Sequence, residues 1–572
     1  MFSRTNIIKG LVLIFIIASF SVPYFFLMVE IKKNVYNFDI YNWLISFGKF
    51  FVYSLFAPLI FLLLLSITKQ KRLLSRVYAV LYIIIYFCAL LLILIYYKYF
   101  GFIPHYNVLA RAYEGSHLVG QVYSQLLGFQ EWTTILLLFA SLGLTITYLS
   151  LPGTTQVKNY IKVLLIIILV FVYYALMLFQ NYRYGSNNLL VKLGSSAAVL
   201  HLGLLPVYKE YVSYEMSYEK KEYPYPGKIN KNNIRQENTA RFKNANIVIV
   251  QIESLETQVV DYRINGKLLM PFLYNFRNQS VYFKNFFAQH SGGASTDADL
   301  SMLTSLLPVR HQVGLYTADY SRIYTLADVL KENGYTSFAL NPIHGQFFNK
   351  NSAYPRAGID NFYDEEFYSG EAKGWYSKDW HFYEQSLDII KKAATPFFAY
   401  IINIQSHGPF KNYSDSTKEV FDFKNVDFSK LQIDYLLSMH EIDLAIEHLY
   451  KMLTKSGLMD NTILLIYGDH VGRALSNTHC LAECIPLFIY HKNLSPSIKT
   501  TPGSHLDLAP TILDLLDISE PDGWLGSSLF YKGNKTILFN DLTVIESNYR
   551  VLQSSRKLEY QPYLDYSNSI VE

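Results

Sequence analysis

The distribution of apolar residues divides this 572-residue chain into two parts of different character. Residues 1–180 are dense in Leu, Ile, Phe and Tyr, whereas polar and charged positions recur regularly from about residue 215 onward. A helix needs about 20 mostly apolar residues to cross a hydrocarbon core of about 30 Å. The first part contains five runs of this kind, at 7–29, 44–67, 77–97, 134–151 and 161–179. Five runs in succession predict an α-helical membrane bundle over residues 1–180.

Basic residues in the short loops predict how this bundle is oriented. The N-terminus carries Arg4 and Lys9, and further basic residues lie in the loop at 69–76 and in the loop at 158–162. Five spans place these three regions on one side, which is the cytoplasmic side by the positive-inside rule. Lys32 and Lys33, in the first loop of the opposite side, weaken the bias slightly. The odd number of spans therefore puts everything after residue 181 outside the cytoplasm.

The pattern of the second part is that of an α/β protein. Residues 181–240 are polar and mixed, and predict a juxtamembrane helix followed by an extended linker. From residue 241 to 572, continuous apolar runs alternate with helical patterns, as expected when both faces of a parallel sheet are covered. The predicted strands lie at 246–252, 336–340, 397–404, 462–467 and 486–490, and two of the helices at 326–333 and 431–453. The alternation predicts a mainly parallel sheet with helices on both faces.

Charge and cysteine content narrow the functional classes. A net charge of +4 is too small to indicate nucleic-acid binding. Three cysteines exclude a disulfide-built scaffold. Cys88 lies within an apolar run, while Cys480 and Cys484 are four residues apart. The latter two either form a disulfide, as a domain outside the cytoplasm permits, or remain free thiols.

Residues that could bind a metal ion follow two of the predicted strands. Glu253 comes directly after the strand at 246–252, and Asp469 and His470 come after the strand at 462–467. Ligands of open α/β sheets bind beyond the carboxyl ends of the strands. Two carboxylates and an imidazole form an oxygen and nitrogen ligand set suited to a divalent metal. Taken singly, a strand-end Asp is more often a helix cap.

A loop of small residues supplies a candidate nucleophile. Residues 291–297 read Ser-Gly-Gly-Ala-Ser-Thr-Asp and precede a helical pattern that starts at Ala298. A hydroxyl at a helix N-terminus lies where backbone N–H groups and the helix dipole favour anions. This placement suits attack on phosphorus, although a plain Ser or Thr helix cap is the alternative interpretation.

Several motifs together resemble the lipoteichoic acid synthase family, a branch of the alkaline phosphatase/sulfatase superfamily. They are Gln251-Ile252-Glu253-Ser254, Tyr282-Phe283-Lys284-Asn285-Phe286-Phe287, the run from Gly292 to Asp299, Tyr467-Gly468-Asp469-His470 and the run from Ser504 to Thr511. The resemblance implies a sulfatase-like extracytoplasmic domain on a multi-pass anchor in a bacterial cytoplasmic membrane. It also implies a transferase that moves phosphoglycerol from phosphatidylglycerol to a glycan, polymer or glycerol-phosphate acceptor. Mn²⁺ is the expected metal, with Mg²⁺ or Zn²⁺ as alternatives.

The family's functional residues fall on identifiable positions of this chain. Its metal ligands match Glu253, Ser295, Asp469 and His470, and its covalent nucleophile matches Ser295 when counted from Asn285-Phe286-Phe287. Serine replaces the threonine of the synthases proper, and the adjacent Thr296 is a rival assignment. The resemblance assigns four residues to substrate binding: His344, Phe348, Lys350 and His407. Phe348 and Lys350 depart from the family's Trp and Arg, and Lys offers phosphate a point charge in place of a bidentate fork.

Three other functions compete with this interpretation. A phosphoethanolamine transferase acting on lipid A or another envelope glycan shares the superfamily and the anchor, but such enzymes are typically cysteine-rich. A true sulfatase requires Cys or Ser in a C/S-x-P-x-R motif, and residues 484–488 lack the Arg. A non-catalytic membrane sensor that retains the fold is the third, and the complete set of candidate ligands speaks against it.

Overall fold

The computed structural model of the protein consists of two compact units, Met1–Tyr218 and Glu219–Glu572. In the first unit the structure describes residues 72–100, residues 129–150 and parts of a helix within 11–29. In the second it describes residues 222–571 except for gaps at 231–233, 236–240, 291–294, 310–313, 346, 425, 476–482, 534, 547–550 and 553–556. The apolar runs predicted at 44–67 and 161–179, and most of the linker at 181–240, lie outside the described residues.

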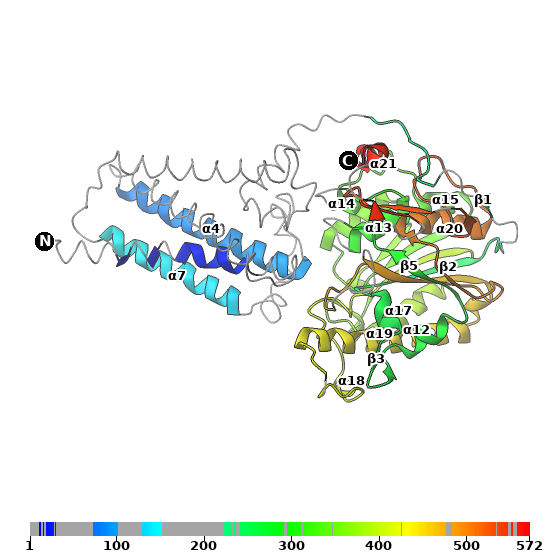
Figure 1. The fold of residues 1–572 in the computed structure, drawn as a ribbon, viewed down its shortest axis with the longest axis horizontal. Helices are drawn as coiled ribbons and strands as arrows, with labels where there is room; N and C mark the ends of the chain where they lie inside the picture. The colour runs from blue at the N-terminus through cyan, green and yellow to red at the C-terminus, as the bar shows by residue number, and fades with distance from the viewer. Residues whose placement is uncertain are drawn as a thin grey trace. The chain divides into compact units, whose positions relative to one another are not determined.

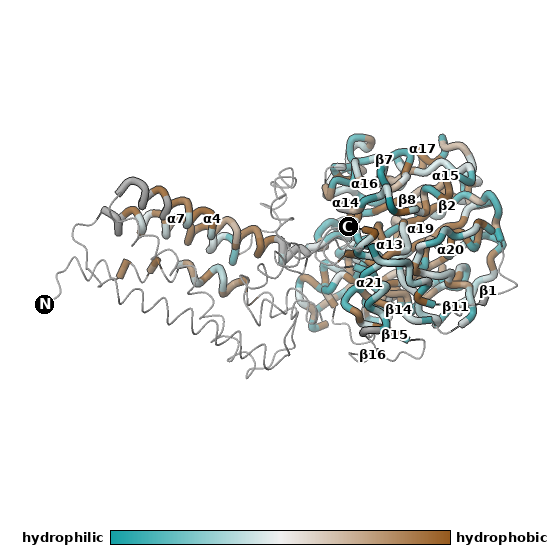
Figure 2. The backbone as a smooth tube through the Cα atoms, turned by 90° about the horizontal axis from the view of Figure 1, so that it is seen from above, coloured by the Kyte–Doolittle hydropathy of each residue, from teal (hydrophilic) through white to brown (hydrophobic). Residues whose placement is uncertain are grey.

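The described part of the first unit is helical and apolar. Helix α4 (Arg72–Phe100) packs against α7 (Phe129–Ser150), and both are coloured mainly as hydrophobic in Figure 2. Ile16, Phe20 and Phe87 form the centre of a small apolar cluster between the described helices. Among the described residues, Phe129–Ile146 is the one segment long and apolar enough to cross a membrane, and Val80–Ile95 is a shorter apolar stretch.

The second unit is built around a nine-stranded sheet (Figure 1). Five neighbouring strands run parallel in the order β9 (Thr462–Gly468), β2 (Asn246–Ile252), β8 (Phe397–Ile402), β6 (Thr336–Leu340) and the edge strand β7 (Asn361–Tyr363). Strand β10 (Cys484–Tyr490) pairs antiparallel with β9 and with β5 (Val281–Phe287), and the short β11 (Ser497–Lys499) and β12 (Gly503–Ser504) run parallel to β5. The predicted α/β class with a mainly parallel sheet is thereby confirmed.

Alternating residues of the central strands feed two separate cores, one on each face of the sheet. Ile247 and Ile249 of β2 face a cluster that includes α13 (Ser295–Thr304), α15 (Leu326–Glu332), α16 (Lys350–Arg356) and α20 (Leu508–Leu516). Val248 and Val250 face the other cluster, with α12 (Pro271–Phe276), α17 (Asp379–Ile390) and α19 (Lys430–Lys455). Because successive side chains of a strand point to opposite faces, one continuous apolar run fills both cores.

Local sequence signals set the ends of the helices. Thr325 and Asp328 form a capping box at the start of α15, and Ser429 and Gln432 form another at the start of α19. Each box satisfies backbone N–H groups that have no partner within the helix. Helix α19 ends before Gly457, whose φ of 77° lies in the left-handed region that glycine adopts freely. These two helices were predicted to within three residues at each end.

The structure differs from the predicted strands in two respects. The strand predicted at 397–404 ends at Ile402, which leaves Asn403 outside the sheet. The strand predicted at 486–490 begins at Cys484 and is the antiparallel member of the sheet. An apolar run reports burial but not direction, so the sequence could not distinguish the two orientations. A small sheet of β14 (Thr536–Leu538), β15 (Val544–Glu546) and β16 (Val551–Leu552) was not predicted.

Candidate active site

The ends of β2 and β9 bring the candidate ligands together. Ile252 pairs with Gly468 in the parallel register. The residues that follow them, Glu253 and Asp469, therefore leave the sheet side by side. A Cβ atom at position 468 would lie 2.2 Å from the Leu255 carbonyl oxygen, and only glycine fits this close approach. The sequence Gly-Asp-His after a buried strand therefore has a steric basis.

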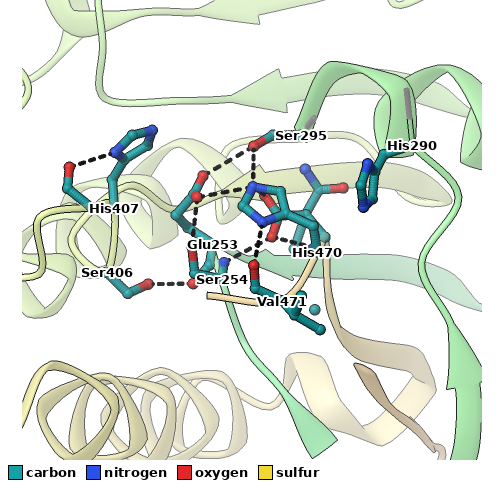
Figure 3. Close-up of polar contacts among 12 residues, drawn as sticks. Glu253, Ser254, His290, Ser295, Ser406, His407, His470 and Val471 are labelled. Atoms are coloured by element: carbon teal, nitrogen blue, oxygen red, sulfur yellow. Dashed lines mark hydrogen bonds and ion pairs between the residues drawn. The ribbon is translucent and has the colours of Figure 1, made fainter. Parts of the chain in front are cut away.

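Glu253, Asp469 and His470 form one compact cluster. Each offers a ligand atom, and these three atoms lie within 4.8 Å of one another. His470 Nε2 is 3.2 Å from Glu253 Oε1 and 3.5 Å from Asp469 Oδ2. The other ring nitrogen, Nδ1, donates to the Val471 carbonyl at 3.0 Å, which fixes the ring with Nε2 facing the carboxylates (Figure 3).

Ser295 points its hydroxyl into this cluster from the start of α13. Its Oγ donates to Glu253 Oε2 over 3.1 Å and lies 3.4 Å from His470 Nε2 (Figure 3). Thr296, the rival candidate, is 1% exposed and lies on the following position of the helix. The structure thus directs the Ser295 hydroxyl toward the ligand cluster. The glycines at 292 and 293 lie outside the described residues.

The titratable groups of the cluster are buried close to one another, and this shifts their pKa values. Burial and the neighbouring Glu253 raise the pKa of Asp469 to about 7. Burial acts to lower the pKa of His470, but the carboxylates of Asp469 and Glu253 outweigh it and raise that pKa to about 10. Burial acts to raise the pKa of Glu253, yet His407 and His470 hold it well below its ordinary value. Two acidic groups with opposite shifts are typical of a functional site.

The donor set fits a divalent cation. Asp469 Oδ2 is buried and has no hydrogen-bond partner among the described residues. A buried carboxylate oxygen without a hydrogen bond is costly unless a cation satisfies it. Together with Glu253 and the His470 imidazole, it offers the mixed oxygen and nitrogen ligands that such ions accept.

A second layer of polar groups holds Glu253 in place. Asn403 Oδ1 accepts from the Glu253 backbone N–H at 2.6 Å, and Ser406 Oγ donates to the Glu253 carbonyl at 2.7 Å. Asn403 in turn donates to Asp379 Oδ2 at 2.5 Å. Burial raises the pKa of Asp379 to about 7. Asn403 was not predicted as a site residue because the predicted strand extended past it, although its strand-end position is itself a signal.

An aromatic group lies beside His407. The His407 ring contacts Trp375 at a centroid distance of 4.9 Å, Trp375 contacts Phe347 at 5.1 Å, and Phe347 contacts Phe348 at 4.5 Å. Phe348 has a φ of 51°, a left-handed conformation that is uncommon for an aromatic residue. His344 lies in the loop that follows β6, and its carbonyl accepts from the Phe347 backbone N–H. Phe348 and His407 are therefore linked through Phe347 and Trp375, neither of which was predicted as a site residue.

Lys350 is placed differently from the expectation that it presents its charge to a substrate phosphate. Its side chain is 4% exposed, and its Nζ lies 3.7 Å from Asp299 Oδ2 in the interior. The ammonium is thus paired within the protein. Asp299 ends the motif run from Gly292 to Asp299, but the sequence gave no indication that it is buried beside Lys350.

On the side of His470 away from Glu253 lies another charged group (Figure 3). His290 is hydrogen-bonded through Nε2 to Glu483 Oε2, and Arg473 donates to Glu483 Oε1 at 3.0 Å. Glu483 precedes Cys484, which is disulfide-bonded, whereas Cys88 is a free cysteine. Cys480 lies outside the described residues. Cys484 is therefore not one of two free thiols.

Comparison with known proteins shows which sequences this chain resembles. Residues 245–518 match the sulfatase family. Lipoteichoic acid synthase 2 of Bacillus subtilis is 29% identical over 316 residues, which are 51% of this chain and 48% of that protein. The lipoteichoic acid synthase of Staphylococcus aureus is 26% identical over 332 residues, 54% of this chain and 51% of that protein. The chain thus matches about half the length of these curated relatives.

A solved structure shows the same fold. The crystal structure of the lipoteichoic acid synthase LtaP from Listeria monocytogenes has a TM-score of 0.51 and 22% sequence identity, covering 60% of this chain and 94% of that chain. The sulfatase match, the curated relatives and the shared fold confirm the resemblance drawn from the motifs. Residues 245–518 thus match the sulfatase family, and about half of the chain is similar in sequence to lipoteichoic acid synthases.

Proposed function

We propose that this protein is a metal-dependent transferase that moves phosphoglycerol from phosphatidylglycerol to a glycan, polymer or glycerol-phosphate acceptor. The observation that carries the proposal is the convergence of the Ser295 hydroxyl on Glu253 and His470. A hydroxyl held beside a metal-ligand cluster at a helix N-terminus is suited to phosphoryl transfer. The relatives named lipoteichoic acid synthases support this choice of reaction.

The reaction proceeds through two displacements at phosphorus. In the first, Ser295 Oγ forms a bond to the phosphorus, the bond to the diacylglycerol oxygen breaks, and the serine proton ends on that leaving oxygen. In the second, an acceptor hydroxyl attacks the phospho-Ser295 and returns the serine hydroxyl. Splitting the transfer lets the lipid product leave before the acceptor enters. The Thr296 and Asp297 amides, in the first turn of α13, lie where phosphoryl oxygens would be stabilised.

The proposed ligands of the metal are Glu253, Ser295, Asp469 and His470. When bound, a divalent cation, Mn²⁺ in the first instance and Mg²⁺ or Zn²⁺ otherwise, lowers the pKa of a coordinated hydroxyl and stabilises charge on phosphoryl oxygens. Asn403 and Ser406 orient Glu253 from both sides of its backbone. His470 is oriented by its bond to the Val471 carbonyl.

His344, Phe348 and His407 are proposed to bind the donor head group. His407 Nδ1 donates to the Gly408 carbonyl at 2.8 Å, which orients its ring. Burial lowers the pKa of His407, so its ring favours the neutral form. Lys350, which the resemblance also assigns to the substrate, is buried against Asp299 and is left out of this group.

A lipid donor gives a reason for the membrane anchor. The proposal includes five spans over residues 1–180, a linker over 181–240 and an extracytoplasmic catalytic domain over 241–572, in the cytoplasmic membrane of a bacterium. The apolar helix segment Phe129–Ile146 supports the anchor. A donor that never leaves the bilayer favours a catalytic domain tethered to the bilayer surface.

The experiment that tests the function uses the full chain in vesicles of phosphatidylglycerol labelled in the head group. Manganese-dependent release of diacylglycerol, with label retained on the Ser295 peptide, is the expected result. Vesicles of labelled phosphatidylethanolamine serve as the comparison. Transfer from phosphatidylethanolamine with none from phosphatidylglycerol would replace the proposed donor, and no transfer from either would refute the proposal.

A further inference from the structure

A buried polar network lies directly beneath Ser295. Asp299, one helical turn along α13, is fully buried, and its Oδ1 accepts from Gln251 Nε2 at 2.8 Å and from the Tyr400 hydroxyl at 2.6 Å. Its Oδ2 accepts from the Tyr354 hydroxyl at 2.8 Å. Asp299 is the acceptor in all three bonds, as an ionised carboxylate is. A charge in this position is stable only if it is compensated.

Lys350 supplies the compensating charge. It is the first residue of α16, its Nζ lies 3.7 Å from Asp299 Oδ2, and the centre of the Tyr354 ring is 5.8 Å away. With 4% of the side chain exposed, the ammonium lies in the interior and not in the solvent. Two buried charges of opposite sign depend on one another, because removal of either leaves the other without compensation.

The network also joins the helix to the strands that carry the ligands. Gln251, on β2, precedes Glu253 by two residues, and Tyr467, on β9, precedes Asp469 by two residues. The Tyr467 hydroxyl donates to Gln251 Oε1 at 2.7 Å. Side chains two residues apart on a strand share a face and are separated by roughly 6.6 Å. Asp299 is therefore held one layer below the residues proposed to bind the metal.

Burial keeps the three tyrosines of the network as hydrogen-bond donors. It raises the pKa of Tyr354, Tyr400 and Tyr467 well above the ordinary value of a phenol. Their hydroxyls consequently stay protonated at physiological pH and keep pointing at carboxylate or amide oxygens. The result is a connection of fixed geometry between the first turn of α13 and strands β2, β8 and β9.

We propose that Asp299 and Lys350 are positioning residues for the nucleophile, and that Lys350 acts through Asp299 instead of contacting the phosphate. The pair fixes the start of α13 on the strand ends, so that Ser295 Oγ stays within reach of Glu253 and His470. The inference rests on the proposed function. It predicts that the two residues are coupled to each other and affect the rate of the covalent step more than the affinity for the donor.

The test compares Asp299→Asn, Lys350→Met and the double variant of the full chain in phosphatidylglycerol vesicles. Each single change is expected to lower kcat by about 10- to 100-fold, because a small displacement of a nucleophile has effects of this size. KM for the lipid is expected to stay within about twofold of the wild-type value, since donor contacts are unchanged. The double variant is expected to be no worse than the poorer single variant, because the two residues act as one unit.

Lys331→Met is the matched control. Lys331 also pairs with an aspartate, Asp360, but 62% of its side chain is exposed, so this variant is expected to leave kcat unchanged. A contact between Lys350 and the phosphate predicts the opposite pattern. In that case Lys350→Met raises KM tenfold or more at unchanged kcat and Asp299→Asn resembles the wild type, which overturns the inference.

A second measurement does not depend on activity. Amide hydrogen exchange within residues 295–304 is expected to accelerate in Asp299→Asn and Lys350→Met, and unchanged exchange in both overturns the inference. If wild type transfers no phosphoglycerol, the proposed function fails while the exchange experiment still tests the pair. If Asp299→Asn does not fold, Lys350→Met and Tyr354→Phe decide the question, because Tyr354→Phe removes one bond to Asp299 and leaves the ion pair.

Discussion

Ser295 Oγ donates a hydrogen bond of 3.1 Å to Glu253 Oε2, and this contact joins the start of α13 to the end of β2. The bond aims the hydroxyl at the candidate ligands Glu253 and His470. Thr296 cannot replace it without rotation of the helix, because its side chain is buried on the following position. The contact between Ser295 and Glu253 therefore favours the Ser295 hydroxyl over that of Thr296, although the two groups have similar chemical reactivity.

We predict that Ser295→Ala abolishes turnover and that Ser295→Thr retains part of it. Alanine removes the attacking oxygen, and loss of a covalent nucleophile costs several orders of magnitude in kcat. Threonine keeps the hydroxyl but adds a methyl group that the site must accommodate, so only part of the turnover is expected to remain. The measurement is release of diacylglycerol from labelled phosphatidylglycerol, followed by mass spectrometry of the modified peptide. Thr296→Ala is the control that keeps labelling at 295, and a label on Thr296 would show the assignment to be wrong.

The candidate metal centre gives a second prediction. Asp469→Ala and His470→Ala are expected to abolish activity and to lower metal content while the domain stays folded, because each removes one of three clustered ligands. Elemental analysis of the purified full chain measures the occupancy. Asp460→Ala, which removes a surface carboxylate paired with Lys492, is the matched control. Full occupancy in both ligand variants would exclude the cluster as the metal site.

Much of the fold follows from continuous apolar runs and from what comes after them. The runs that became β2 and β9 are buried on both faces, and a parallel register places their following residues, Glu253 and Asp469, side by side. The sequence could therefore indicate which strand ends carry the chemistry. It could not indicate that β10 is antiparallel, since burial alone does not encode direction.

The polar residues around the site were harder to predict, for a physical reason. Asn403 and Asp299 are buried polar groups whose partners lie far away in the sequence, such as Glu253 for Asn403 and Tyr400 for Asp299. No local periodicity marks such a residue, because its cost of burial is offset only by long-range hydrogen bonds. Lys350 shows the same limit, since a lysine with a buried partner has the same local sequence as one that faces a substrate.

His505 is predicted to make the stability of the catalytic domain depend on pH. Its Nδ1 accepts from the Gln289 backbone N–H, and its Nε2–H donates to the Gly468 carbonyl, each at 3.1 Å. Burial lowers the pKa of His505 from 6.5 to about 4. The neutral ring fits both partners, whereas a second ring proton would face the Gln289 N–H.

The sign follows from linkage. A histidine whose pKa is lower in the folded state contributes its full stability above pH 6.5 and loses it as the pH falls toward 4. A shift of this size corresponds to a loss of roughly 3 kcal/mol across that window. Thermal unfolding is measured at several pH values in chelator, which removes any contribution from metal binding. The slope of the unfolding temperature against pH is expected to be smaller for His505→Gln than for wild type. His381→Gln, at an exposed position, is the control, and equal slopes for all three proteins would contradict the prediction.

The last prediction concerns the side of the membrane on which the catalytic domain lies. Five spans place residue 181 onward outside and the basic loop at 69–76 inside. We predict that a cysteine at Glu222 reacts with an impermeant thiol reagent on intact spheroplasts, whereas a cysteine at Lys71 reacts only after the membrane is permeabilised.

Glu222 suits the probe because 87% of its side chain is exposed, while Asn230, further along the linker, is buried. Both substitutions are made in a Cys88→Ser background, because Cys88 is a free thiol and Cys484 is already disulfide-bonded. Labelling at 71 without labelling at 222 would invert the orientation, and labelling of both sites would require an even number of spans between them in place of the predicted three.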